Sequence, residues 1–184
     1  MPRSLDHVSR RQFMRRATVT LAAGLVLPFA GRHSARAQRP TSTTVLTRED
    51  IEADEPWLDV GLDDQVAIAM RGSEPARVIP VTTGAPRWET PVGQFRIRYR
   101  VADEHMTSDA LGIPRDSPEG YDLDHVLWTQ YFDEEGDALH TNYWQPLSVF
   151  GSEPTSHGCV GMLEGDAAFL WQFLGLGSVV NIHA

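Results

Sequence analysis

From about residue 57 onward the chain alternates apolar with polar residues, a pattern of period two that predicts β-strands. The alternation is clear in residues 66–70 and resumes in residues 76–83. In residues 95–101 every second residue is apolar and arginines stand between them, which predicts one strand with an apolar and a charged face. Shorter strands are predicted at residues 126–132, just before His140 and at residues 178–183, with a long loop over residues 106–124.

One segment has helical spacing instead. Apolar residues recur there every three or four positions and two glycines follow them, the set being Leu163, Ala167, Leu170 and Leu174, then Gly175 and Gly177. This spacing predicts one helix that ends near the glycines. Several strands with one helix in the C-terminal half, and no regular alternation of strand and helix, predict a mostly β domain.

The N-terminal region has the features of an export signal. Two adjacent arginines, Arg10 and Arg11, precede a modest apolar run at residues 17–30, and a small-x-small cleavage site ends at Ala37. The apolar run is too short and too rich in alanine, threonine and glycine for a comfortable membrane span. We therefore expect a twin-arginine signal peptide that delivers a folded protein to the periplasm, the cell wall or the extracellular space.

The chain is thus expected to have three parts. Residues 1–37 are the signal peptide, residues 38–56 a polar linker or arm, and residues 57–184 the folded domain. No cysteine lies near the cleavage point, so a lipid anchor there is excluded, and no stable membrane anchor is expected after cleavage.

Charge restricts the partners of this protein. The full chain has a formal net charge of −9 and contains no lysine. Seven of its arginines fall in residues 1–37, so the remaining chain keeps nine basic and 24 acidic residues, a formal charge of −15. Nucleic acids and anionic membranes need a basic surface, and both are therefore disfavoured as partners.

The candidate chemistry lies around Cys159, which is the one cysteine in the sequence. It follows His157 and Gly158, and His140 lies nineteen positions before it. A thiolate beside an imidazole is a nucleophile, and a glycine lets a carbonyl group approach backbone N–H donors closely. The alternatives are an inert buried cysteine or a zinc site of His140, His157 and Cys159. Because the sequence indicates no fourth zinc ligand, no metal and no cofactor is expected.

A wider pattern surrounds these residues. His140, followed after fifteen residues by Ser156-His157-Gly158-Cys159-Val160, resembles the signature of the L,D-transpeptidase catalytic domain, a family of cysteine enzymes of peptidoglycan. Residues 57–69 resemble the opening hairpin of that family, and residues 81–97 resemble its VSTG…TPxGxF segment. The likeness extends over residues 57–183.

The resemblance implies a fold and a reaction. The fold is a sandwich-like arrangement of mixed β-sheets, with the cysteine beneath a mobile hairpin or lid. Cys159 attacks the carbonyl between the third and fourth residues of a stem tetrapeptide, D-alanine leaves, and a thioester remains. The side-chain amine of a diamino acid in a second stem then forms the cross-link. Carbapenems are implied as covalent inhibitors.

The resemblance also implies roles for the neighbouring residues. His140 is the base, and the backbone carbonyl of Thr141 orients it. Backbone N–H groups around His157, Gly158 and Cys159 hold the oxyanion, and the His157 ring supports the loop. Contacts with the substrate are expected from three further side chains, which are Ser156, Tyr143 and Trp144.

Other functions fit the same residues. An L,D-carboxypeptidase or a cell-wall cysteine peptidase would use the same pair, His140 and Cys159, with water as the acceptor. A weakened peptidoglycan-binding module is a third possibility. It is favoured by Gly161, which stands where the family usually carries asparagine or arginine. If a contact is missing there, Gly161→Asn should speed the reaction. If the backbone needs a positive φ, the same change should slow it.

Overall fold

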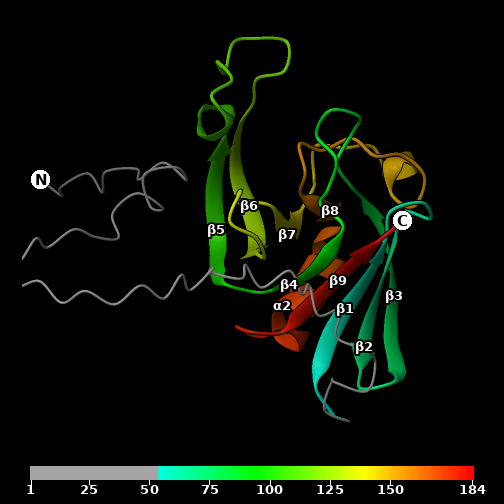
Figure 1. Ribbon diagram of the computed structural model, residues 1–184. Helices are drawn as coiled ribbons and strands as arrows, with labels where there is room; N and C mark the ends of the chain where they lie inside the picture. Colours follow the sequence, from blue (N-terminus) through cyan, green and yellow to red (C-terminus); the bar gives the residue numbers. More distant parts are fainter. Residues whose placement is uncertain (1–53) are drawn as a thin grey trace, which may run out of the picture. The chain divides into compact units, whose positions relative to one another are not determined.

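Residues 54–184 are described by a computed structural model, in which nine strands form one mixed sheet (Figure 1). The strand order is β4-β9-β1-β2-β3-β8-β7-β6-β5. The strands are β1 (Pro56–Gly61), β2 (Val66–Arg71), β3 (Glu74–Thr82), β4 (Gly93–Arg96), β5 (Tyr99–Thr107), β6 (Asp122–Tyr131), β7 (Ala138–Thr141), β8 (Val160–Met162) and β9 (Val179–His183). The helices are the α-helix α2 (Glu164–Phe173) and the 3₁₀ turns η2 (Ser108–Leu111) and η3 (Leu147–Val149).

The mostly β fold with one α-helix is confirmed for the described residues. β1 and β2 form the predicted opening hairpin, and α2 ends at Phe173, two residues before Gly175. The sandwich-like shape arises from a single sheet that curls at β3. The first part of β3 pairs with β2, whereas Val81 and Thr82 pair with β8. The predicted signal peptide lies outside the described residues.

One strand prediction and one loop prediction are wrong. The alternating residues 95–101 do not form one strand, because the chain changes partners in the middle. The Ile97 N–H donates to the carbonyl of Ser178, next to β9, whereas the Arg98 N–H donates to the carbonyl of Tyr131, at the end of β6. As a result β4 and β5 lie at opposite edges of the sheet.

The predicted loop over residues 106–124 is also shorter than expected. β5 continues to Thr107, η2 follows, and β6 begins at Asp122. In Figure 1 this β5–β6 hairpin extends well beyond the neighbouring strands. Arg115 holds the hairpin together, because its guanidinium group pairs with Asp109 and Asp122 at 2.6 and 2.7 Å.

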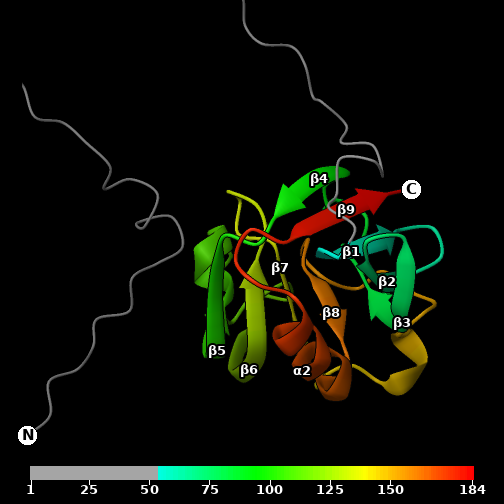
Figure 2. The ribbon, with the colours of Figure 1, turned by 90° about the horizontal axis from the view of Figure 1, so that it is seen from below.

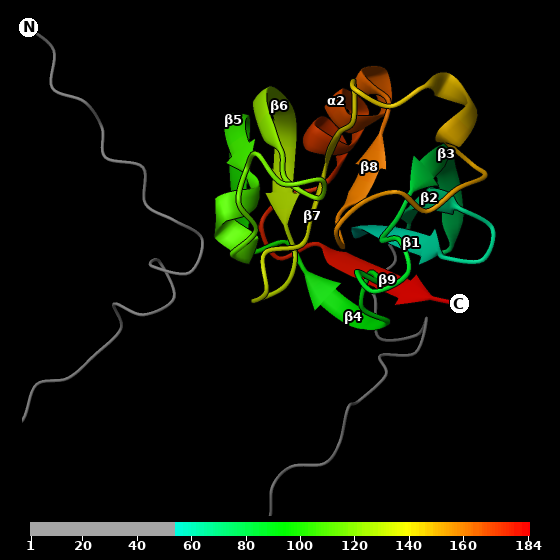
Figure 3. The same ribbon diagram turned by 90° about the horizontal axis from the view of Figure 1, so that it is seen from above.

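The core lies on both faces of the strands that carry the site. The larger apolar cluster joins α2 to strands from both halves of the curl, including Ile79, Leu139 and Leu170. Figures 2 and 3 show α2 between β6 and β8. A second cluster forms around Cys159, and its other buried members are Met106, Val126, Tyr131 and Ala138. β7 and β8 therefore have the main core on one face and Cys159 on the other.

The main core gives a stability prediction. Leu170 on α2 is fully buried, whereas Leu176, just after the helix, is 69% exposed. Leu170→Ala should lower the free energy of unfolding by about 2–5 kcal/mol, because it removes buried contacts and leaves a cavity. Leu176→Ala is the matched control and should change it by less than about 0.5 kcal/mol. Urea unfolding of both variants measures the difference, and equal effects would contradict this assignment of the core.

Candidate active site

His140 is held in a defined orientation at the end of β7. Its side chain is 4% exposed. Ring atom Nδ1 lies 2.6 Å from the backbone carbonyl oxygen of Thr141. A carbonyl oxygen only accepts hydrogen bonds, so Nδ1 carries the hydrogen, and Nε2 is then the basic nitrogen of the neutral ring. This is the contact expected from the Thr141 backbone.

Cys159 shares one face of the sheet with His140. β7 and β8 are parallel, with Leu139 opposite Val160 and His140 opposite Gly161. Residues in register project to the same face, and so do residues two apart on one strand. Cys159 precedes Gly161 by two positions and therefore lies on the face that carries the His140 ring. The thiol is 9% exposed.

The loop before Cys159 is fixed by hydrogen bonds. Gly158 has φ of +111°, a conformation that L side chains rarely adopt. A side chain there would also meet Asp137, whose Oδ1 lies 2.2 Å from the Cβ position. The Thr90 hydroxyl donates to the Gly158 carbonyl at 2.8 Å. The Ser156 hydroxyl donates to the Cys159 carbonyl at 2.5 Å and accepts from the Gly158 N–H at 3.2 Å, so Ser156 acts within the loop.

His157 lies between two aromatic rings. Its ring centroid is 5.1 Å from that of Trp88 and 5.5 Å from that of Tyr121, on the β5–β6 hairpin. Burial lowers the pKa of His157, against a smaller opposing effect of Glu119. The neutral ring is therefore favoured. His157 connects the loop before Cys159 to the hairpin, a contact that spacing in the sequence did not reveal because Tyr121 is distant in the chain.

The two aromatic residues after the β7 strand have different positions. Trp144 stacks on the His140 ring with a centroid distance of 5.9 Å, and Tyr143 meets Trp144 edge-on at 5.0 Å. The exposed Tyr143 donates its hydroxyl to the carbonyl of Asp124 at 2.7 Å. The structure therefore brings Trp144 to the His140 ring and directs the Tyr143 hydroxyl to β6.

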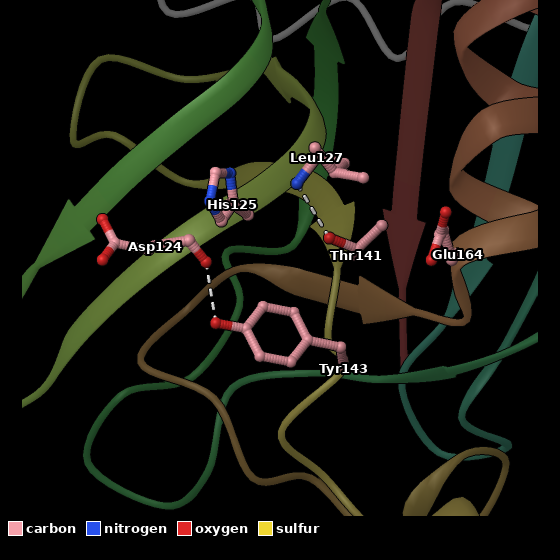
Figure 4. Close-up of a pocket in the computed structure, with 6 residues that line it drawn as sticks. All are labelled: Asp124, His125, Leu127, Thr141, Tyr143 and Glu164. Atoms are coloured by element: carbon pink, nitrogen blue, oxygen red, sulfur yellow. Dashed lines mark hydrogen bonds between the residues drawn. The ribbon is translucent and has the colours of Figure 1, made fainter.

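Tyr143 lines a pocket of about 320 Å³ (Figure 4). Its other lining residues are Asp124, His125, Leu127, Thr141 and Glu164. Thr141 is adjacent to His140, so its side chain points to the opposite face of β7. Its hydroxyl accepts a hydrogen bond from the Leu127 N–H at 2.9 Å, as the dashed line in Figure 4 marks. The pocket therefore lies on the side of β7 away from the His140 ring.

Gly161 does not have the backbone expected of an obligatory glycine. Its φ is not positive, so the explanation that residue 161 needs a backbone angle open only to glycine is wrong. A Cβ atom at this position would lie 2.4 Å from Asn142 Nδ2 and 2.9 Å from Asn142 Cβ. The position is thus already filled by a carboxamide from the neighbouring strand. The expectation that Gly161→Asn alone restores a missing contact is therefore corrected.

Within residues 54–184, His, Cys, Asp and Glu side chains do not gather in groups of three that could hold a metal ion. No helix in this part of the chain is long and apolar enough to cross a membrane.

Comparison with known proteins places this arrangement in a family. The model of the L,D-transpeptidase catalytic domain, YkuD, matches residues 55–182. The probable L,D-transpeptidase 3 of Mycobacterium tuberculosis is 32% identical over 106 residues, which are 58% of this chain and 38% of that protein. The chain therefore aligns with well under half the length of this relative.

Solved structures show the same fold. An L,D-transpeptidase in complex with imipenem matches with a TM-score of 0.67 and 24% identity, covering 71% of this chain and 59% of the other. L,D-transpeptidase 3 from Mycobacterium tuberculosis, in complex with a faropenem-derived adduct, has a TM-score of 0.65 and 24% identity, with coverages of 70% and 60%. The family model, the shared fold and the common face of His140 and Cys159 agree. The chain belongs to the L,D-transpeptidase catalytic domain family.

Proposed function

We propose that this protein is a peptidoglycan L,D-transpeptidase that joins two stem peptides through a thioester on Cys159. The observation that carries the proposal is the register of β7 and β8. It places Cys159 on the face of the His140 ring, while Thr141 holds that ring by Nδ1. A thiol and an imidazole with its second nitrogen fixed are the parts that nucleophilic acyl transfer requires.

In the first step Cys159 gives its proton to Nε2 of His140, and the sulfur attacks the carbonyl carbon between the third and fourth stem residues. The C–N bond breaks, the proton passes to the departing amine of D-alanine, and a thioester remains. In the second step the side-chain amine of a diamino acid in another stem attacks the thioester carbonyl. His140 takes a proton from that amine, and the Cys159 thiolate is released.

The oxyanion of each tetrahedral intermediate is stabilised by backbone N–H groups of the catalytic loop. The Ser156 hydroxyl accepts a hydrogen bond from the Gly158 N–H at 3.2 Å and so holds this part of the loop. We propose that the N–H groups around His157, Gly158 and Cys159 bind the oxyanion. The closed loop geometry around Gly158 keeps these groups in place before substrate arrives.

Access to the thiol requires movement of the β5–β6 hairpin. Cys159 and His140 are both buried, and hairpin residue Met106 is part of the cluster around Cys159. Tyr121 of the same hairpin contacts the His157 ring. In the proposed cycle the hairpin opens to admit the stem peptide and closes to exclude water, so that an amine resolves the thioester.

Two further proposals concern inhibitors and location. One related structure holds imipenem and another a faropenem-derived adduct. We propose that carbapenems likewise acylate Cys159 here. The twin-arginine pattern at residues 9–15 supports export of the folded protein to the periplasm or cell wall, where its substrate lies.

The proposed reaction predicts distinct products. Incubated with disaccharide-tetrapeptide, the wild type should yield a cross-linked dimer and free D-alanine, which mass spectrometry resolves. Cys159→Ala should yield neither product and form no carbapenem adduct, because it lacks the nucleophile. Its circular dichroism spectrum should match that of the wild type. Tripeptide without dimer would indicate a carboxypeptidase, unchanged substrate would indicate a binding module, and an adduct on Cys159→Ala would refute the assignment of the nucleophile.

The roles of His140 and Thr141 are separable. His140→Ala should lower the acylation rate by about 10²–10⁴-fold, the usual range for loss of a general base. Thr141→Ser should stay near the wild-type rate, because the backbone carbonyl remains and the serine hydroxyl can still accept from Leu127. Stopped-flow acylation by a carbapenem measures both. Equally large losses would mean that the Thr141 side chain takes part.

Export can be tested in cells. Arg10→Lys combined with Arg11→Lys should leave the precursor in the cytoplasm, because the twin-arginine route recognises the paired arginines as an address. The adjacent pair Arg15 and Arg16 offers a matched control, and its double lysine variant should be exported. Immunoblots of cell fractions measure the distribution. Normal export of the first variant would point to the general secretory route.

A further inference from the structure

Asn142 has a buried carboxamide with an unused acceptor. Its side chain is 3% exposed, and Oδ1 has no hydrogen-bond partner within residues 54–184. The backbone is fixed, because the Asn142 N–H donates to the Met162 carbonyl at 2.9 Å. Asn142 follows His140 by two positions, so an extension of the β7 pattern places both side chains on one face. A buried acceptor without a partner is unfavourable and rare in native proteins.

Gly161 provides the space for this carboxamide. Asn142 Nδ2 lies 2.4 Å from the position that a Cβ atom of residue 161 would occupy. Gly161 is in register with His140 and follows Cys159 by two residues. Neighbouring strands lie about 4.8 Å apart. The carboxamide of Asn142 therefore lies against the Gly161 backbone, on the face of the sheet that carries His140 and Cys159.

A substrate is the natural source of the missing donor. Asn142 is as deeply buried as His140 and Cys159. Asn142 also lies two residues from His140 on the face that carries Cys159, so a peptide bound along this face meets its carboxamide. Peptide substrates carry an N–H group on either side of the scissile carbonyl, whereas the catalytic loop offers that carbonyl only donors. Asn142 Oδ1 supplies the complementary acceptor.

We propose that Asn142 is a substrate-binding residue whose Oδ1 accepts a hydrogen bond from a backbone N–H of the donor stem peptide. The proposal depends on the proposed transpeptidase function and deepens it. The carboxamide fills the place that Gly161 leaves vacant, so the side chain that follows β7 serves where one from β8 would otherwise stand. A carboxamide at this position is expected to bind the substrate N–H whether residue 142 or residue 161 carries it.

The first test replaces the carboxamide by an apolar group of the same shape. Asn142→Leu should lower the acylation rate by tetrapeptide about tenfold, because one hydrogen bond to the substrate is lost. Its melting temperature should not fall, since the unpaired acceptor is removed. The rate and pH profile of Cys159 alkylation by iodoacetamide should be unchanged, because this small reagent does not use the peptide contact.

Gln130 provides a matched control. It is fully buried, and neither of its amide atoms has a partner in the described part of the chain. Gln130 is in register with Leu139, which belongs to the main core, so it lies on the face opposite His140. Gln130→Leu should leave tetrapeptide acylation and iodoacetamide alkylation at wild-type rates.

The second test moves the carboxamide to the other strand. Gly161→Asn alone should be less stable and slower, because the new Cβ atom overlaps Asn142. Asn142→Ala should be about tenfold slower than the wild type with tetrapeptide. The double variant Asn142→Ala with Gly161→Asn should recover most of the wild-type rate. A rate no higher than that of Asn142→Ala, at wild-type melting temperature, would overturn the proposal.

The outcomes separate this inference from the proposed function. A wild type that neither reacts with tetrapeptide nor releases D-alanine would overturn both. A reactive wild type with an equally fast Asn142→Leu would overturn only the role of Asn142. A shifted iodoacetamide pH profile in Asn142→Leu would also overturn it, because Asn142 would then act through the Cys159–His140 pair.

Discussion

The pairing of two short parallel strands determines where His140 and Cys159 lie in this protein. β7 has four residues and β8 has three, yet their register sets which face each side chain occupies. Because side chains alternate along a strand, a shift of one residue would move Cys159 into the main core and leave His140 without it. The strands on either side prevent that shift. β3 pairs with β8 and β6 pairs with β7, and Leu139, Val160 and Met162 anchor the register in the core.

Two glycines beside Cys159 make room for side chains from the region of β7. Gly158 and Gly161 lie on either side of Cys159, and each leaves room for a polar side chain from the β7 region, Asp137 and Asn142 respectively. They do so for different reasons. Gly158 combines close contact with a positive φ, whereas Gly161 has ordinary backbone and contributes only space.

Local patterns in the sequence predicted local structure well. The opening hairpin and the helix Glu164–Phe173 have strong periodicity. The motif singled out His140 and Cys159, which the register of β7 and β8 brings to one face, and their catalytic roles stay a prediction. The change of partner at Ile97 and Arg98 could not be predicted, because alternation continues while the hydrogen bonds pass from one strand to another. β8 is too short for a periodic signal. The contacts of Tyr121 with His157 and of Asn142 with Gly161 depend on tertiary geometry, which no spacing in the chain reveals.

The position of β9 has a consequence for the order of assembly. β9 lies between β1 and β4, and it pairs Val180 with both Leu58 and Phe95. During synthesis the ribosome produces β1 and β4 long before β9, so β4 has no neighbour in the sheet until the last of the nine strands emerges. Such pairings across long stretches of sequence are slow to form and leave open strand edges in the meantime. This half of the sheet therefore forms only after β9 has been synthesised.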